Sequence, residues 1–179
     1  QEIDFTSMYQ PLSKWAVEVE DPKRLPEIIA RAFAVAKGGR PGPVVISLPE
    51  DMLVEKVKVE DALAAELPHP EPADNDLKTL SDMMSDADKP LVIFGGGGWT
   101  EESVEDLEAF CEGNSLPAIA SFRVQDIFNN DHPNFIGELG YNTNPKLAQR
   151  VKNSDFILAI GARLGETATQ AYTLIKAPK

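Results

Sequence analysis

Cysteine and histidine are scarce in this chain, and each scarcity removes a class of chemistry. The 179 residues include one cysteine, Cys111, which cannot form an internal disulfide, and only two histidines. Cys111 follows Val104 and Leu107 at helical spacing, so we expect it to be a buried apolar side chain rather than a reactive thiol. His69 and His132 have no second ligand at metal-binding spacing, and no metal site is predicted from them.

Long apolar runs and an excess of positive charge are also missing. The apolar runs are of strand length, with no signal-peptide core and no membrane span, so a cytoplasmic location is expected. The chain has 17 basic and 29 acidic residues, a formal net charge of −12. Between Glu50 and Glu112 there are 18 acidic residues and 4 basic ones. This region is most simply a solvated face plus a charged linker, and because it repels a phosphate polymer, no nucleic-acid partner is expected.

The most informative stretch that is present covers residues 38–51. Its two leading glycines can take the left-handed conformation that ends a helix, and the two prolines after them fix a turn. Residues 44–48 are short, apolar and rich in β-branched side chains, which is typical of a parallel strand covered by helices. A helix is predicted upstream of the glycines, beginning at the N-cap Asp21. Its apolar face would consist of Leu25, Ile28, Ile29, Ala32, Phe33 and Ala36.

This block resembles the end of the pyrimidine-binding domain of thiamine diphosphate-dependent enzymes in the acetolactate synthase and pyruvate oxidase group. Those proteins carry a helix, a Gly-Arg-Pro-Gly-Pro-Val turn, an apolar strand and a Pro-x-Asp-Met ending, which correspond here to residues 39–44 and 49–52. The resemblance continues through residues 161–163 and covers nearly the whole chain. It implies that residues 1–55, which open in a polar stretch expected to be loop-like, are the C-terminal part of a pyrimidine-binding domain.

A second α/β unit is predicted after a linker at residues 56–75, where several prolines favour an extended connection. Strand patterns at 91–94, 116–120 and 155–160 alternate with helical patterns. The expected helices begin near Asp76, at the N-cap Thr100 and at Asn144 before Pro145. We therefore expect an α/β fold, in which a partial α/β domain precedes a parallel, doubly wound, Rossmann-like central domain over residues 76–179, truncated at its C-terminus.

Three of the predicted strand ends could hold a ligand, at residues 95–98, 121–123 and 161–163. In open parallel sheets, ligands bind beyond the carboxyl ends of the strands. Glycines let backbone N–H groups approach a phosphate, and a helix beginning at Thr100 would add its positive end, although two glutamates follow it. The chain contains neither G-x-G-x-x-G nor a Walker lysine and serine pair, so a tight turn explains the glycines equally well.

Arg163 is the better candidate for an anion, since an arginine just past a strand end can bind a phosphate with two hydrogen bonds. An ion pair with Glu166 is an equally good interpretation. In the acetolactate synthase branch, the central domain holds FAD through strand-end glycines and the arginine of a Gly-Ala-Arg motif. This chain departs from the flavin-binding members at two places. They usually have Gly-Met-His-Gly where residues 140–143 are Gly-Tyr-Asn-Thr, and their acidic motif after the arginine is replaced by Leu-Gly-Glu at residues 164–166. The resemblance implies a site for FAD or ADP at Gly96, Gly97, Gly161 and Arg163.

The resemblance also assigns a catalytic role to Gln1. Gln1 and Glu2 match a Phe-Gln-Glu motif whose glutamine lies beside the thiazolium and the substrate, although the plainer interpretation is a chain end without a role. The activating glutamate is absent from the chain, and no Gly-Asp-Gly is present to hold the diphosphate through magnesium.

The implied parent is an enzyme dependent on thiamine diphosphate and Mg²⁺, and a homo-oligomer (dimer or tetramer). It would decarboxylate a 2-keto acid and transfer the carbanion to an acceptor. The chain alone is expected to be inactive. Two alternatives stay open from the residues: a module that binds an adenine nucleotide such as FAD, ADP or coenzyme A, and a purely structural spacer.

Overall fold

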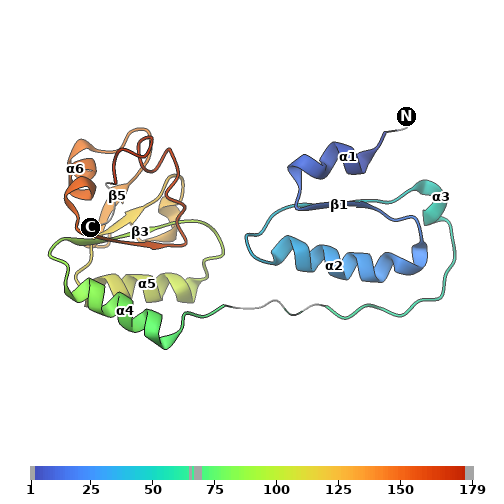
Figure 1. The fold of residues 1–179 in the computed structure, drawn as a ribbon, viewed down its shortest axis with the longest axis horizontal. Helices are drawn as coiled ribbons and strands as arrows, with labels where there is room; N and C mark the ends of the chain where they lie inside the picture. Colours follow the sequence, from blue (N-terminus) through green and yellow to red (C-terminus); the bar gives the residue numbers. More distant parts are fainter. Residues whose placement is uncertain (1–2, 65, 67–69, 176–179) are drawn as a thin grey trace. The chain divides into compact units, whose positions relative to one another are not determined.

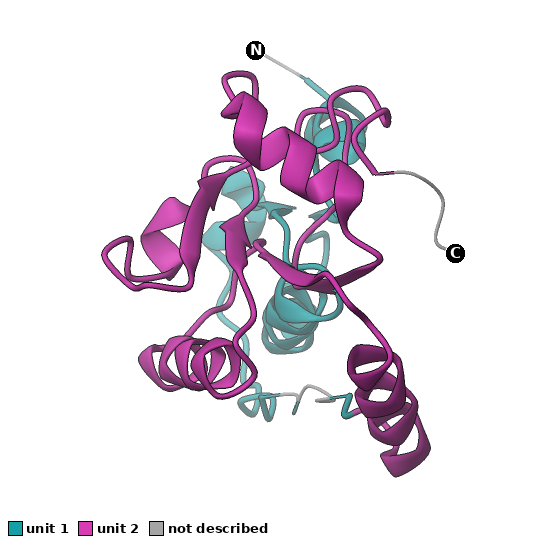
Figure 2. Ribbon diagram, turned by 90° about the vertical axis from the view of Figure 1, so that its left-hand side faces the viewer, with its two compact units in different colours: residues 1–71 teal, residues 72–179 magenta. Residues whose placement is uncertain are grey.

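The structure, a computed structural model, describes residues 3–64, 66 and 70–175. The chain divides into two compact units, residues 1–71 and 72–179, which are shown in separate colours in Figure 2. Each unit contains its own parallel sheet. No described helix combines the length and apolar character needed to cross a membrane.

The first unit is built on a two-stranded parallel sheet, which Figure 1 shows between two helices. β1 (Trp15–Glu18) pairs with β2 (Val44–Ser47), and the connection between them contains α2 (Leu25–Lys37). α1 (Phe5–Tyr9) lies on the other side of the sheet. With one neighbour for each strand, the residues of β1 and β2 are at most half-buried.

The helix predicted after Asp21 is present. The Asp21 carboxylate accepts a hydrogen bond from the Lys23 backbone N–H at 2.9 Å and starts a short 3-10 turn, η2 (Pro22–Arg24), which leads directly into α2. Of the two glycines expected to end the helix, Gly39 takes the left-handed conformation with φ 56°, whereas Gly38 is extended. One left-handed residue is enough to turn the chain toward β2.

The core of the first unit is small. Its fully buried apolar residues include Val19, Ile28 and Met52, the last from the short helix α3 (Glu50–Leu53) that follows β2. Phe33 was expected on the buried face of α2, but its side chain is 62% exposed. The sheet is too narrow to cover the whole apolar face of the helix.

The opening stretch is folded, which corrects the expectation of a loop. Asp4 caps α1 by accepting a hydrogen bond from the Ser7 backbone N–H at 2.8 Å. β1 forms because its residues pair with β2, with Trp15 opposite Val44. A helix of five residues and a strand of four are too short to produce a readable hydrophobic period.

The second unit contains a four-stranded sheet in the order β5-β4-β3-β6, with every pair parallel. The strands are β3 (Pro90–Phe94), β4 (Ala118–Ala120), β5 (Phe135–Glu138) and β6 (Phe156–Ile160). The chain runs outward from β3 to β5 and then returns to the other side of β3. The predicted α/β class with a parallel, doubly wound sheet is confirmed for this unit.

Helices cover both faces of this sheet. α6 (Pro145–Asn153) lies on one face, and α4 (Asp74–Ser85) and α5 (Glu101–Gly113) lie on the other, as Figure 1 shows. The predicted N-caps are present: Thr100 forms a capping box with Ser103 at the start of α5, and the Asn144 side chain caps α6. The described residues between α3 and α4 form no helix or strand.

Alternation along β3 divides the core into two layers. Leu91 and Ile93 pack on the α6 side with Leu147 and Val151, whereas Val92 and Phe94 pack on the α5 side. All four side chains of β3 from Leu91 to Phe94 are at most 1% exposed. A strand buried on both faces must be apolar throughout, which explains why it was readable from sequence.

β5 was not predicted. It contains Gly137 in its middle, with φ 123°, and its pairing with β4 is interrupted by a register shift. The Asn134 side chain fixes the segment before β5 by donating to the carbonyls of Cys111 at 3.1 Å and Leu116 at 2.9 Å. A glycine inside a short strand hides the alternating pattern, so the strand depends on its partner rather than on its own sequence.

Candidate functional site

The carboxyl ends of β3 and β6 form the point at which the strand order reverses. β4 lies on one side of β3 and β6 on the other, so the connections after β3 and β6 leave the sheet toward opposite faces. Open α/β sheets bind ligands in the crevice at such a point. Two of the three strand ends predicted from the sequence, residues 95–98 and 161–163, meet here.

Gly96 and Gly161 are brought together backbone to backbone. Both have positive φ, 77° and 64°. A Cβ on Gly96 would lie 2.4 Å from the Gly161 carbonyl oxygen, and a Cβ on Gly161 would lie 2.6 Å from the Gly95 carbonyl oxygen. Only glycine fits at either position, and the close approach of two turns accounts for this.

The same turn is fixed by neighbouring groups. The Trp99 indole N–H donates to the Gly95 carbonyl at 3.0 Å, and the Gly95 N–H donates to the Ile160 carbonyl at 3.1 Å. Gly95 is buried, and a Cβ there would lie 2.8 Å from the Ser121 Cβ. The ends of three strands are therefore packed on one another. Gly97 and Gly98, by contrast, face open space.

The N-terminus of α5 is occupied by its own side chains. The Thr100 hydroxyl accepts from the Ser103 backbone N–H at 3.2 Å, and the Ser103 hydroxyl accepts from the Thr100 N–H at 2.8 Å. Glu101 and Glu102 stand in the first turn, where they stabilise the helix dipole but repel an anion. The capping box therefore uses two of the N–H groups through which a helix start can bind a phosphate, and the two glutamates stand beside the others.

Arg163 follows this junction and is exposed. Its backbone carbonyl accepts from the Gly165 N–H at 2.8 Å, which makes a tight turn. No described acidic side chain pairs with its guanidinium, so the ion pair with Glu166 that was one interpretation is not formed. Arg163 is the one of the four predicted cofactor residues whose side chain is free to bind an anion.

An aromatic cluster that the sequence did not predict lies after β4 and β5. The Phe122 and Tyr141 rings meet edge to face at 5.3 Å, and the Arg123 guanidinium lies 4.8 Å from the centre of the Phe122 ring. Arg123 itself has φ 65°. The residues come from separate connections, so no sequence spacing could reveal the cluster. It offers stacking and one positive charge, but no group for acid–base chemistry.

Residues 170–172 form a left-handed turn after β6. Gln170, Ala171 and Tyr172 have φ values of 49°, 53° and 62°, a conformation that costs energy for residues other than glycine. The buried Thr169 hydroxyl accepts from the Tyr172 N–H at 3.0 Å and donates to the Gly165 carbonyl at 2.8 Å. Leu174, fully buried, anchors the end of the turn in the core.

Among the described residues, the structure brings no predicted catalytic residue to the junction between β3 and β6. Gln1, the predicted catalytic residue, lies outside the described residues, as does His69. No cluster of three metal-ligating side chains occurs among residues 3–64, 66 and 70–175. The thiol of Cys111 is buried, and burial together with nearby Glu108 raises its pKa to about 11, so it stays protonated. His132 packs against Phe128 and accepts from the Asn134 N–H.

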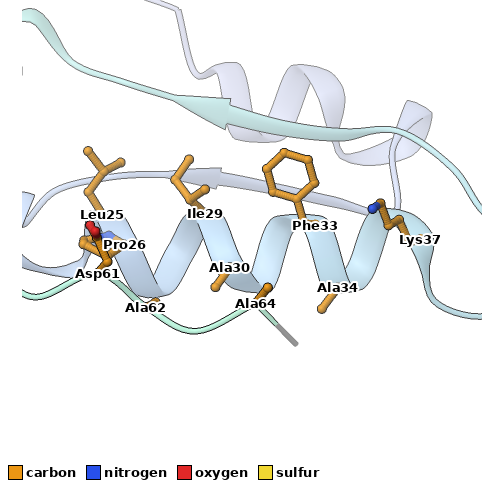
Figure 3. Close-up of a pocket in the computed structure, with 10 residues that line it drawn as sticks. All are labelled: Leu25, Pro26, Ile29, Ala30, Phe33, Ala34, Lys37, Asp61, Ala62 and Ala64. Carbon is orange, nitrogen blue, oxygen red and sulfur yellow. The ribbon is translucent and has the colours of Figure 1, made fainter. Parts of the chain in front are cut away.

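A groove of about 700 Å³ lies in the first unit, along α2. Figure 3 shows its lining, in which Ile29 and Phe33 of α2 contribute apolar surface and Asp61 and Lys37 contribute charge. The residues that line it are Leu25, Pro26, Ile29, Ala30, Phe33, Ala34, Lys37, Asp61, Ala62 and Ala64. The lining combines no nucleophile with a base, so the groove is a packing surface rather than a catalytic pocket.

Residues 77–179 match the family described as "Thiamine pyrophosphate enzyme, central domain". The chain is 29% identical to a sulfoacetaldehyde acetyltransferase of Rhodobacter capsulatus. The aligned region covers 94% of the chain and 28% of that relative. It is 27% identical to a probable acetolactate synthase large subunit of Methanocaldococcus jannaschii, covering 94% of the chain and 30% of the relative.

A glyoxylate carboligase of Escherichia coli O157:H7 is 29% identical, covering 94% of the chain and 29% of that protein. The chain thus spans under a third of the length of each of these relatives.

Proposed function

Because this chain belongs to the thiamine pyrophosphate enzymes through their central domain, we propose that it is part of a larger thiamine diphosphate-dependent enzyme and is inactive by itself. The parent enzyme acts on a 2-keto acid or a related small carbonyl compound and transfers a carbon fragment from it to an acceptor. When bound, thiamine diphosphate supplies the carbanion-stabilising group that this chemistry needs. Magnesium accompanies the diphosphate.

The observation that carries this proposal is the similarity of 94% of the chain to enzymes named for acetyl transfer, acetolactate synthesis and carboligation. The match includes the first unit as well as the central one. The described residues contain no metal-ligating cluster, and the sequence contains no Gly-Asp-Gly. The groups that hold the cofactor would then be supplied by other parts of the parent enzyme.

The domain assignment follows the same proposal. Residues 1–55 are the end of a pyrimidine-binding domain, residues 56–75 are a linker, and residues 76–179 are the central domain. Gln1 would be the only catalytic group that this chain contributes. Homo-oligomerisation, which would let two subunits share an active site, and a cytoplasmic location stay predictions.

For the central unit, we favour a structural role among the alternatives considered from the sequence. Gly96 and Gly161 are explained by the contact between their own turns, without a ligand. Of the four predicted cofactor residues, Gly97 and Arg163 are then the two that could still contact a ligand. The unit would act as a rigid spacer between the catalytic domains of the parent enzyme.

The test compares this chain with the longer protein that contains it. Consumption of pyruvate, glyoxylate and sulfoacetaldehyde is measured with and without thiamine diphosphate and magnesium. We expect cofactor-dependent consumption of at least one compound by the longer protein and none by the chain. Turnover by the chain alone, or activity of the longer protein that persists after the cofactor is removed, would contradict the proposal.

A further inference from the structure

We infer that the junction between β3 and β6 is closed by the protein's own backbone and does not take the diphosphate of FAD or ADP. This is the group that the resemblance leads one to expect at these strand ends. The inference depends on three features of the second unit: the contact between the Gly96 and Gly161 turns, the capping of the N-terminus of α5 and the charge of the nearby residues.

The glycines are accounted for without a ligand. Glycine is useful in a dinucleotide site because the ligand's phosphates can then approach the backbone. At Gly96 and Gly161 the close approach is made instead by the opposite turn, whose carbonyl oxygens would lie 2.4 and 2.6 Å from an added Cβ. Trp99 holds this arrangement by its hydrogen bond to the Gly95 carbonyl, and its ring is 3.7 Å from the position of a Cβ on Gly161.

The helix start that would hold a diphosphate is partly used by its own side chains. In dinucleotide sites, the free N–H groups at the start of the first helix bind the phosphates. Here the capping box between Thr100 and Ser103 occupies the N–H groups of both residues. The N–H groups outside the capping box belong to Glu101 and Glu102, whose carboxylates in the first turn repel a diphosphate.

The charge near the turn is unfavourable for the same ligand. Glu101 and Glu102 follow the glycine turn directly, and Glu166 follows Arg163 by three residues. Along the chain, the three strand ends are followed by the arginines Arg123 and Arg163 and by these three carboxylates, so they carry no net positive charge to attract a diphosphate. Gly97 and Gly98 leave open space, but that space begins beside the two acidic residues of α5.

The fluorescence of Trp99 can report ligand binding at the junction, because this side chain lies in the turn after β3. The chain has two tryptophans, Trp15 in β1 and Trp99 in the turn itself, so a Trp15→Phe variant reports the turn alone. The full chain carrying this substitution is titrated with FAD and, separately, with ADP. We expect no saturable change in Trp99 fluorescence and no rise in melting temperature at a large excess of either ligand.

A saturable change with a raised melting temperature would overturn the inference, and an Arg163→Ala variant would then identify whether that guanidinium binds the phosphate. The titration measures nucleotide binding to this chain, and the 2-keto acid assay measures cofactor-dependent turnover by the longer protein. The two proposals can therefore fail separately.

The glycine contact is tested by matched substitutions. Gly96→Ala and Gly161→Ala should each lower the melting temperature by several degrees or prevent folding, whereas Gly97→Ala, which meets open space, should change it little. A Gly96→Ala variant as stable as the parent chain would overturn the account of the junction. The nucleotide titration uses the native glycines and does not depend on these variants folding.

Discussion

The two units differ in how completely they bury their strands. In the second unit, β3 has a neighbour on each side and its side chains are fully buried, whereas β1 and β2 of the first unit have one neighbour each and are at most half-buried. Parallel strands are normally covered on both faces, and a two-stranded sheet is marginal by itself. The second unit therefore buries its central strand on both faces, whereas no strand of the first unit has a neighbour on each side among the described residues.

Exposed apolar residues follow the same division. In the first unit they lie on α1, on α2 and after β2, with Leu12, Phe33 and Val54 more than 60% exposed. The second unit exposes fewer such side chains, and its β-strands carry Ile136 alone among them, at 37%. Apolar surface of this kind is typical of a region that contacts another part of a larger protein.

The largest expected effect comes from truncating matched side chains in the two sheets. Phe94→Ala removes a fully buried ring that stacks on Phe128 at 5.3 Å, and should cost the second unit about 4 kcal/mol in free energy of unfolding. Ile46→Ala removes a half-buried side chain of β2 and should cost the first unit about 1 kcal/mol.

Urea unfolding measures each unit with its own tryptophan. Trp15 reports the first unit after Trp99→Phe, and Trp99 reports the second unit after Trp15→Phe. Equal losses of free energy from Phe94→Ala and Ile46→Ala would remove the distinction between the units.

A smaller effect is expected from removing the Asn134 side chain, whose two hydrogen bonds fix the segment before β5. Asn134→Ala leaves the Cys111 and Leu116 carbonyls without their side-chain donor and should destabilise the second unit by about 2 kcal/mol. Asn114→Ala is the control, since its exposed amide donates to one carbonyl only, that of Phe110. If both variants unfold at the same urea concentration, the hydrogen bonds of Asn134 do not stabilise the second unit more than the single bond of Asn114 does.

The second unit also contains local strain that can be relieved. Ala171 has φ 53°, so Ala171→Gly should raise the free energy of unfolding by about 1 kcal/mol. Ala109→Gly, at an exposed position inside α5, should lower it by a similar amount of about 1 kcal/mol. Calorimetry of the two variants gives the sign directly, and a loss of stability in both would show that the left-handed turn is not strained.

The smallest effects concern carboxylates with depressed pKa values, one in each unit. Hydrogen bonds from the side chain and backbone of Ser7, and from Thr6, lower the pKa of Asp4 to about 2. Desolvation opposes the ionised form of the exposed Asp155, but the backbone N–H groups of Lys89 and Asp88 donate to its carboxylate and lower its pKa overall. Each contribution to stability is present above the usual carboxyl pKa and is lost as the pH falls through the depressed value.

Carbon-13 NMR titration of the carboxyl groups checks this directly. We expect Ser7→Ala to raise the pKa of Asp4, because it removes the first of the hydrogen bonds that lower it, and to leave Asp155 unchanged. Ser13→Ala, whose hydroxyl donates to Tyr9 rather than to Asp4, is the control. An Asp4 pKa that does not respond to Ser7→Ala would show that the Ser7 hydroxyl does not stabilise the ionised carboxylate.

The sequence predicted the elements whose signal is local. Residues 91–94 are apolar without interruption, and Thr100 and Asn144 are strong N-caps, so a buried strand and two helix starts were readable. β5 was not readable, because Gly137 interrupts its alternating pattern and the strand is defined by its pairing with β4. Elements that depend on a distant partner cannot be read from their own residues.

The candidate site shows the same limit. Strand-end glycines were identified, but nothing local indicates that Gly96 and Gly161 touch each other, because β3 and β6 are far apart in the chain. The Phe122 and Tyr141 pair depends in the same way on the neighbouring positions of β4 and β5. Position in the sheet, rather than residue type, decided between a ligand site and a turn.

Hydrogen exchange of the whole chain tests most directly the claim that the second unit buries its central strand and the first unit does not. The account predicts that the amides of Val92 to Phe94 in β3 exchange only through global unfolding of the second unit, and that those of β1 and β2 exchange orders of magnitude faster. Equal protection of the two sheets would contradict it, because the first unit would then be stable without further strands.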